Sequence, residues 1–233
     1  FFWDGRVEGL RNQVLHPMVD LNEMAAELPE IRERLSEDEE YIASFKAVFK
    51  SYSITSELIG FALEQYLFSL TSSDSRFDRA SLGEVEFTDQ EKRGLELFVT
   101  EYDPRRQLYG ADCFHCHGNN LFTNHQYMNN GLDAEVTDLG RFLVTGDESD
   151  KGKFVTPSLR NVALTAPYMH DGRFETLEDV VEHYSSGIQI SNTLDPNLFK
   201  HVRGVQMNQE DQAALVAFLR TLTDEHTLDD YSF

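Results

Sequence analysis

The chain has 233 residues, a formal net charge of −21 and an isoelectric point near 4.6. An acidic surface of this kind argues against nucleic-acid binding, because phosphate recognition needs clustered Lys and Arg. No stretch approaches the roughly eighteen uncharged apolar residues that a membrane-spanning helix needs, so no membrane span is expected. The charge would suit a basic protein partner, although solubility alone also accounts for it.

The amino terminus resembles the middle of a folded domain. The chain starts at Phe1 rather than Met, and no signal peptide precedes the opening sequence Phe1-Phe2-Trp3-Asp4-Gly5-Arg6. We therefore expect that the chain begins inside a longer polypeptide or follows a processing step.

Helical spacing of apolar residues predicts two helices in the first part of the chain, over residues 37–50 and 56–70. The first helix has its apolar residues at Tyr41, Ile42, Phe45, Val48 and Phe49. The second is apolar around most of its circumference. The polar residues 71–76 that follow interrupt the pattern and predict a loop.

A new unit is expected to start near residue 87. Thr88 and Glu91 form a capping box, which predicts the start of a helix. Residues 118–160 are rich in Gly, Asn and Asp and should be mostly loop. A last helix is capped by Asn208, and its apolar face is formed by Leu215, Phe218, Leu219 and Leu222. We therefore expect a mainly α protein, with part of one domain in residues 1–86 and a complete domain in residues 87–233.

Both cysteines of the chain lie in one pentapeptide, Cys113-Phe114-His115-Cys116-His117. A zinc site would usually need a second cysteine pair, and none exists. A redox-active pair of the thioredoxin type belongs in an alternating strand–helix pattern, which this chain lacks. Attachment of a c-type haem uses all three residues: two thioether bonds from Cys113 and Cys116, and iron ligation by His117. We therefore predict one covalent haem c, held in a cytochrome c-like domain between the helix that starts near residue 88 and the last helix. Because haem c is attached outside the bacterial cytoplasm, we expect a periplasmic protein.

The sixth iron ligand cannot be chosen by residue type, since the chain has five Met and nine Tyr. Thr176 and Asp179 predict another capping box, at the start of a helix that carries Val180 and Tyr184. These last two residues are four apart and share a helix face. The local pattern alone favours Tyr184 as an ordinary core aromatic over an iron ligand.

Several further stretches carry a resemblance that covers essentially the whole chain. They are residues 2–6, Gln13 with His16-Pro17, Glu23-Met24, the pentapeptide at 113–117, residues 156–161 (Thr-Pro-Ser-Leu-Arg-Asn) and residues 165–172 (Thr-Ala-Pro-Tyr-Met-His-Asp-Gly). In this set and order the chain resembles the bacterial di-haem cytochrome c peroxidase and MauG family. That family has two cytochrome c-like domains, each with one covalent haem. The resemblance therefore implies that residues 1–86 are the remainder of the first of these domains.

The resemblance implies a role for the predicted haem and for its sixth ligand. In the family the C-terminal haem passes or stores electrons, and the N-terminal haem meets the peroxide. The sixth ligand of the C-terminal haem lies fourteen residues after the His of the His-Asp-Gly motif, which from His170 leads to Tyr184. Peroxidases proper have Met at this position, whereas MauG and its relatives have Tyr. A phenolate is a hard anion that favours ferric iron, so Tyr184 shifts the expectation toward MauG-like chemistry.

The resemblance also implies roles for four residues near the amino terminus. Trp3 matches the residue that relays electrons between the two haems. Glu23 matches the distal acid that moves a proton between the peroxide oxygens, a role that requires a carboxylate within hydrogen-bond reach of the peroxide. Gln13 matches the distal amide that positions ligand and water, and Pro17 matches a proline of the same pocket.

A structural calcium ion lies between the haems in this family. Its expected ligands in this chain are the main-chain carbonyls of Thr165 and Pro167, hard oxygen donors that suit the ion. The third ligand, an Asn, is expected upstream of residue 1.

Two departures from the family pattern bear on function. The N-terminal Cys-x-x-Cys-His is absent, and we expect it in a segment that precedes Phe1, associated with this chain. A homodimer is also possible on the sequence. The second departure is Met128, where relatives often have His, and its effect is open.

Three functions remain open on the sequence. The first is a peroxidase that reduces hydrogen peroxide with electrons from a small cytochrome c or cupredoxin. The second is a MauG-like enzyme that oxidises residues of a partner protein. The third is a mono-haem electron carrier with a vestigial first domain, which the retained Glu23 and Gln13 argue against.

Overall fold

The computed structural model describes residues 1–199 and 204–225. Nearly all of its regular structure is helical, as predicted, and the chain divides into two compact units. Unit 1 comprises residues 1–2 and 6–71, and unit 2 comprises residues 3–5 and 72–233. Among the residues described, no helix has the length and apolar character needed to cross a bilayer.

Unit 1 consists of five helices around a small apolar cluster. The helices are α1 (Leu10–Gln13), α2 (His16–Val19), α3 (Leu28–Glu37), α4 (Glu39–Phe49) and α5 (Ser56–Ser69). The buried centre is formed by Phe45, Ile54 and Ile59. Asp38 caps α4 and Thr55 caps α5 by accepting main-chain N–H bonds, which explains where the two helices predicted from apolar spacing begin.

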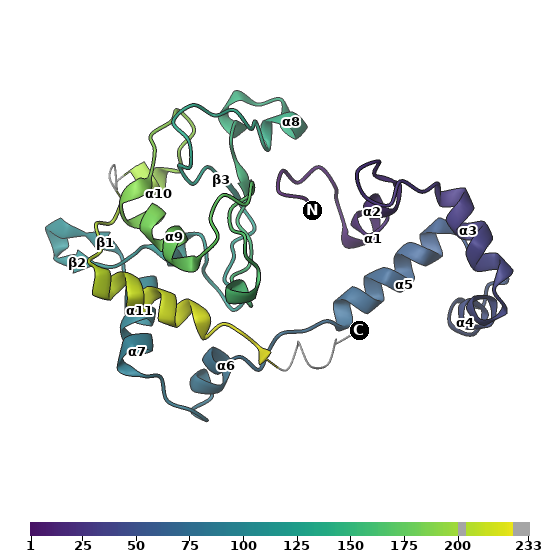
Figure 1. The fold of residues 1–233 in the computed structure, drawn as a ribbon, viewed down its shortest axis with the longest axis horizontal. Coiled ribbons are helices and arrows are strands. Elements are labelled where there is room, and N and C mark those ends of the chain that lie inside the picture. Colours follow the sequence, from purple (N-terminus) through teal and green to yellow (C-terminus); the bar gives the residue numbers. More distant parts are fainter. Residues whose placement is uncertain (200–203, 226–233) are drawn as a thin grey trace. The chain divides into compact units, whose positions relative to one another are not determined.

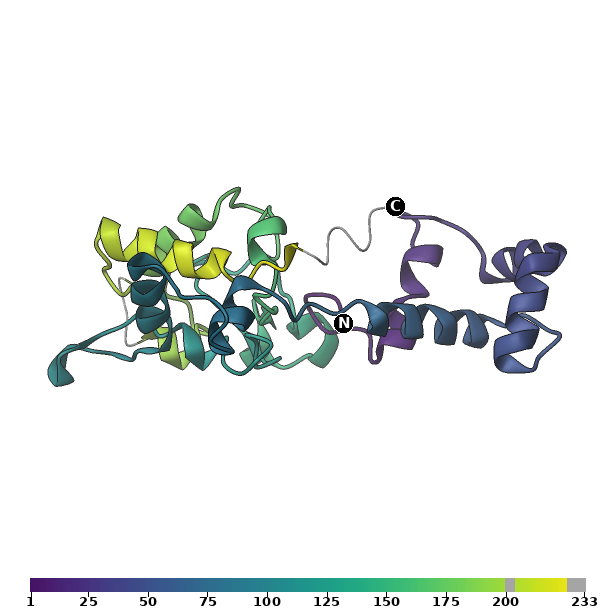
Figure 2. The same cartoon turned by 90° about the horizontal axis from the view of Figure 1, so that it is seen from below.

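Unit 2 is built on the packing of α7 (Asp89–Val99) against α11 (Gln209–Arg220), which lie side by side in Figure 1 and Figure 2. Thr88 and Glu91 form the predicted capping box, and Asn208 caps α11 through the N–H of Asp211. The core between the helices includes a pair of aromatic rings, those of Phe98 and Phe218, whose centroids lie 5.1 Å apart.

Short elements connect the two long helices of unit 2. They are, in chain order, β1 (Tyr102–Asp103), η1 (Pro104–Arg106), β2 (Leu108–Tyr109), η2 (Cys113–His115), β3 (Tyr127–Met128), α8 (Phe142–Thr145), η3 (Glu148–Asp150), β4 (Phe154–Val155), η4 (Val162–Leu164), α9 (Leu177–Glu182), η5 (His183–Gly187) and α10 (Pro196–Phe199). β1 pairs antiparallel with β2, and β3 with β4. Residues 118–160 are mostly irregular, as predicted.

Two local predictions need correction. The stretch 71–76 was expected to be all loop, but Arg76 starts α6 (Arg76–Ser81), because Ser75 and Asp78 form a capping box. At Thr176 the hydroxyl does accept the N–H of Asp179, as expected of a cap. The Asp179 carboxylate, however, accepts from the Thr176 hydroxyl rather than from its main-chain N–H, so the box is not reciprocal.

Candidate functional site

The pentapeptide at residues 113–117 forms a tight turn on the wall of a cavity of about 450 Å³ in unit 2. Asp112 has a left-handed backbone (φ 59°) at the start of this turn, and the N–H of His117 donates to the carbonyl of Cys113 at 2.9 Å. The turn brings Cys113, Cys116 and His117 onto the cavity wall together.

The two cysteines are held as neutral thiols. Burial raises the pKa of Cys113 to about 12 and that of Cys116 to about 11. A zinc site or a disulfide-exchange site needs thiolates, whose pKa such sites lower with cationic or metal neighbours. Cys113 instead directs its Sγ at the carbonyl of Ala111, 3.5 Å away. This environment is unfavourable to a disulfide-exchange site, which needs a thiolate without the help of a metal.

His117 is oriented by a main-chain carbonyl. Its Nδ1 lies 2.9 Å from the carbonyl oxygen of Phe122, and because a carbonyl only accepts, Nδ1 carries the hydrogen. The lone pair is then on Nε2, which is the arrangement that a metal-ligating histidine uses. Burial lowers the pKa of His117, with the carbonyls of Phe122 and Pro157 partly opposing it, so the ring is neutral at physiological pH.

Tyr184 lines the same cavity, from a π-helical turn that continues α9. Turns of this kind are frequent at functional sites. The Tyr184 carbonyl accepts the N–H of Val205 at 3.2 Å, which fixes the turn against the following segment. The side chain is enclosed, and burial raises the pKa of Tyr184 to about 12, while the Asn130 amide beside it acts in the opposite direction.

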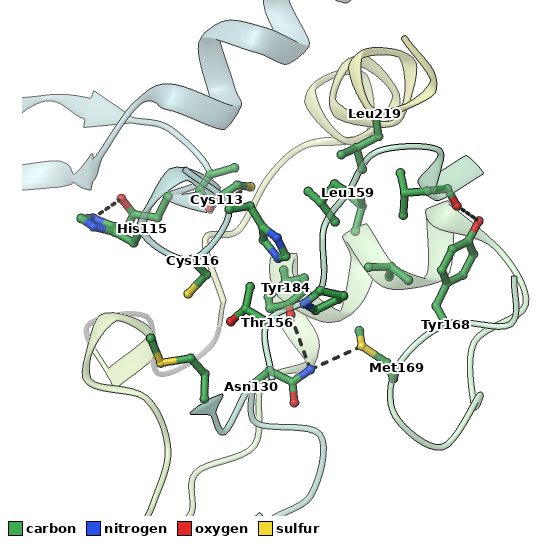
Figure 3. Close-up of a pocket in the computed structure, with 18 of the residues that line it drawn as sticks. Cys113, His115, Cys116, Asn130, Thr156, Leu159, Tyr168, Met169, Tyr184 and Leu219 are labelled. Carbon is green, nitrogen blue, oxygen red and sulfur yellow. Dashed lines mark hydrogen bonds and ion pairs between the residues drawn. The ribbon is translucent and has the colours of Figure 1, made fainter. Parts of the chain in front are cut away.

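Figure 3 shows the surroundings of Tyr184 within this cavity. The hydroxyl oxygen of Tyr184 lies 3.5 Å from Nδ2 of Asn130, and the same nitrogen lies 3.4 Å from Sδ of Met169. Val180, predicted to share a face with Tyr184, also lines the cavity.

The cavity fits a covalently attached haem. Most of its remaining wall is apolar, including Phe98, Leu159, Val162, Leu177, Val180, Val181, Ile188, Leu215 and Leu219. The wall of this one apolar cavity contains two thiols three positions apart, a neutral imidazole and a phenol. This set of donors suits a covalently attached haem.

Three more predicted residues line this cavity: Trp3, Thr165 and Pro167. The carbonyl of Trp3 accepts the N–H of Val155 at 2.8 Å, which attaches the N-terminal segment to β4. Trp3 as a whole residue is 40% exposed. Thr165 and Pro167 are exposed residues of one short loop.

The other predicted residues lie in unit 1. Gln13 ends α1, Pro17 is in α2, and Glu23 is exposed in the turn that follows, where the N–H of Met24 donates to the Pro17 carbonyl at 3.1 Å. The Oε1 atom of Gln13 is buried without a hydrogen-bond partner among the residues that the structure describes. Water or a ligand is expected beside a buried acceptor that has no hydrogen-bond partner of this kind.

Sequence reasoning missed Asn130, Met169 and the carbonyl of Phe122. Asn130 and Tyr184 are 54 positions apart, so no local pattern joins them. The one local signal is the Asn130-Gly131 pair, which predicts a turn but no contact with Tyr184.

Comparison with known proteins finds two family matches. A family described as di-haem cytochrome c peroxidase matches residues 1–86, and the cytochrome c family matches residues 106–223. The chain is 32% identical over 230 residues to a cytochrome c551 peroxidase of Nitrosomonas europaea, and 33% identical over 229 residues to the methylamine utilization protein MauG of Methylorubrum extorquens. These alignments cover 96% and 97% of this chain, which spans 61% of the length of each relative.

Two solved structures are also similar. One is a MauG-like protein associated with microbial copper homeostasis, with a TM-score of 0.84 and 32% identity, covering 97% of this chain and 74% of that one. The other is the diheme peroxidase BthA of Burkholderia thailandensis, with a TM-score of 0.76 and 25% identity, covering 98% of this chain and 67% of that one.

Proposed function

Because the chain belongs to the family of di-haem cytochrome c peroxidases and MauG proteins, we propose that it is the later part of a periplasmic enzyme that consumes hydrogen peroxide. The observation that carries the proposal is the gathering of Cys113, Cys116, His117 and Tyr184 on the wall of one apolar cavity. The periplasmic location follows from haem c attachment, which takes place outside the bacterial cytoplasm.

Four residues of unit 2 would hold the haem. Cys113 and Cys116 form the thioethers, His117 ligates the iron through Nε2, and Tyr184 ligates it through its phenol oxygen. The bound haem supplies an iron that gains and loses single electrons. Tyr184, as a hard anionic ligand, favours the ferric state, so this site is suited to supplying electrons rather than storing them.

Peroxide chemistry belongs to the residues of unit 1. Hydrogen peroxide accepts two electrons and two protons and yields two molecules of water. Glu23 would take the proton from one peroxide oxygen and return it to the other, so that the second oxygen leaves as water. Gln13, whose Oε1 is buried and unpaired within the described chain, would orient the peroxide or a water. Pro17 would form part of the same pocket. The haem of that pocket would be a second one, attached outside the 233 residues of this chain.

Trp3 and the loop at 165–167 complete the proposal. Trp3 lines the cavity of unit 2 and would relay electrons toward the peroxide site. The carbonyls of Thr165 and Pro167 would contribute two oxygen ligands to a calcium ion. The electrons would come from a small cytochrome c or cupredoxin, for which the −21 charge favours a basic donor.

A second function is favoured by Tyr184. Peroxidases proper have Met at the position of Tyr184, whereas MauG proteins have Tyr, as this chain does. In a MauG-like enzyme the oxidising equivalents of hydrogen peroxide would be delivered to residues of a partner protein. The two functions share every residue named above and differ in where the electrons originate.

The test follows peroxide consumption by the full-length native protein, with a reduced basic cytochrome c as donor. We expect two donor molecules oxidised for each peroxide, and a loss of about a hundredfold or more in rate for Glu23→Gln. Glu33→Gln, an exposed carboxylate of α3, is the control and should leave the rate unchanged.

An absence of peroxide consumption, or an unchanged rate in Glu23→Gln, would contradict the proposal. Peroxide consumption without donor oxidation, accompanied by a mass change in a partner protein, would select the second function.

A further inference from the structure

We propose that Asn130 is the positioning residue for the Tyr184 oxygen, and that the thioether of Met169 sets the direction in which the Asn130 amide points. This inference rests on the proposed function, because it takes Tyr184 to be an iron ligand. It assigns a role to two residues that lie beside the ligand and do not themselves bind the metal.

The geometry places one nitrogen between two acceptors. Nδ2 of Asn130 is 3.5 Å from the Tyr184 oxygen and 3.4 Å from Sδ of Met169. The dashed lines that start at Asn130 in Figure 3 mark these two contacts. An amide nitrogen has two hydrogens, so it can donate to both atoms at once.

Met169 decides which end of the amide faces Tyr184. A thioether has no hydrogen to donate and can only accept, so the NH₂ end of Asn130 is the end that gains from facing it. With the amide in that orientation, the Tyr184 oxygen receives a hydrogen bond and keeps its lone pairs available for the iron. The opposite orientation would present Oδ1, which would accept from the Tyr184 hydroxyl and hold Tyr184 as a neutral phenol.

The main chain holds Asn130 close to the turn that carries Tyr184. The carbonyl of Asn130 accepts a hydrogen bond from Nε2 of His183 at 3.1 Å. His183 is a buried residue that directly precedes Tyr184 in the π-helical turn. Asn130 is therefore tied to this turn twice, by its carbonyl and by its side chain.

The position of Met169 is fixed by its backbone conformation and by the loop that contains it. Met169 has a left-handed backbone (φ 71°), which is unfavourable for a side chain of this kind and is kept only where the surroundings enforce it. The N–H of Tyr168 donates to the carbonyl of Phe174 at 2.7 Å and closes the loop around Met169. Arg173 of the same loop donates to the carbonyl of Leu132 and pairs with Asp133, just after Asn130 in the chain.

The effect of Asn130 on the iron follows from charge. A hydrogen bond to the phenol oxygen withdraws electron density from it and weakens its donation to ferric iron. Removing that bond while Tyr184 stays bound should strengthen the iron–oxygen bond and lower the reduction potential of the haem.

The experiment measures the iron–phenolate stretching band by resonance Raman spectroscopy, with the reduction potential, on the holoprotein of the full chain. Tyr184→Phe should abolish the band. Asn130→Leu, in which leucine is similar in size to asparagine and has no hydrogen-bond donor, should shift the band to higher frequency and lower the reduction potential. If Tyr184 detaches in this variant, the band should disappear.

Met169→Leu should weaken the band, because the Asn130 amide is then free to turn. Met18→Leu, a methionine that packs on the apolar cluster of unit 1 and is not among the residues that line the cavity, should leave the band unchanged.

The outcomes separate this inference from the proposed function. If Tyr184→Phe abolishes the band but Asn130→Leu and Met169→Leu leave band and potential unchanged, the inference is wrong and Tyr184 remains a ligand. If Tyr184→Phe leaves the spectrum unchanged, the ligand assignment itself fails. Asn130→Leu should have no spectral effect in a Tyr184→Phe background. Should Asn130→Leu not take up haem, the comparison of Met169→Leu with Met18→Leu decides the question.

Discussion

Arg160 joins segments of unit 2 that are far apart in the chain. Its guanidinium donates two bonds of 2.9 Å to the carboxylate of Asp78, 82 positions away, and its Nε donates to the carbonyl of Asn120 at 3.0 Å. The side chains of Arg160 and Asp78 are only 14% and 16% exposed. Arg160 also lines the cavity, so this pair connects α6 to the wall of the candidate site.

Replacing Asp78 by Asn should destabilise the protein and change its response to acid. The Arg160 guanidinium holds the pKa of Asp78 below its usual value, with bonds from Ser75 assisting and burial opposing. A carboxyl whose pKa is lower in the folded state stabilises above its unfolded pKa, about 4, and that stabilisation is lost as the pH falls through the folded value. We expect Asp78→Asn to cost about 2 kcal/mol near neutral pH, and to make the free energy of unfolding less dependent on pH below about 4.

Urea unfolding across this pH range measures both effects. The control is Glu30→Gln, which removes the exposed i,i+4 pair of Glu30 with Arg34 and should change stability by no more than about 0.5 kcal/mol. Equal stability of Asp78→Asn and the native chain, or an unaltered pH dependence, would contradict the role given to this pair.

Single residues differ in how much the sequence reveals about them. The pairing of Cys113 and Cys116 with His117 could be predicted because the chemistry is contained in five consecutive residues. Tyr184 needed the resemblance to a family, since its pattern alone also fits a core aromatic. Asn130 could not be predicted, because its partners Tyr184 and Met169 are distant in the chain and meet only after folding.

At the level of elements, Gly94 allows α7 and α11 to approach closely. A Cβ atom at this position would lie 2.0 Å from the carbonyl oxygen of Ala214 and 2.6 Å from Cβ of Phe218. All three positions are buried, and Ala214 and Phe218 lie on α11. Neither the backbone of Ala214 nor the packed side chain of Phe218 can move aside without cost.

Gly94→Ala should therefore destabilise unit 2, although alanine favours helices by about 1 kcal/mol over glycine. Overpacking of a helix contact costs about 1–3 kcal/mol, and the backbone overlap here places the cost toward the upper end. Chemical denaturation monitored by helical circular dichroism measures the change. Gln90→Ala, an exposed position of the same helix, should be neutral or slightly stabilising. A Gly94→Ala variant as stable as the native chain would show that the two helices are packed less closely.

Elements were predictable where a local signal marks their ends. α7 and α11 were predicted correctly from their capping residues, Thr88 and Asn208, and from the apolar face of α11. α6 was overlooked because its capping box, Ser75 to Asp78, lies inside a polar stretch that also reads as loop. The π-helical turn at His183–Gly187 has no sequence signature, since its carbonyls are bonded by a distant segment, as in the bond from Gln206 to Ser185.

On the scale of the whole molecule, the proposed chemistry is divided between the two units. Unit 2 contains the cavity with Cys113, Cys116, His117 and Tyr184, whereas Gln13, Pro17 and Glu23 lie in unit 1. The domain boundary predicted after residue 86 remains a prediction. Since the chain spans 61% of the first two relatives, the site that Glu23 serves is proposed to need residues beyond these 233.

The most direct test is the haem count of the full-length native protein, by intact mass and pyridine haemochrome assay, with peptide mapping of the attachment site. The account predicts one haem bound covalently to the peptide that contains Cys113 and Cys116, and a second haem bound outside these 233 residues. An unmodified peptide at Cys113 and Cys116 would contradict the central claim. A single haem in the whole protein would leave Glu23 and Gln13 with no iron to serve, and would make the protein an electron carrier rather than an enzyme.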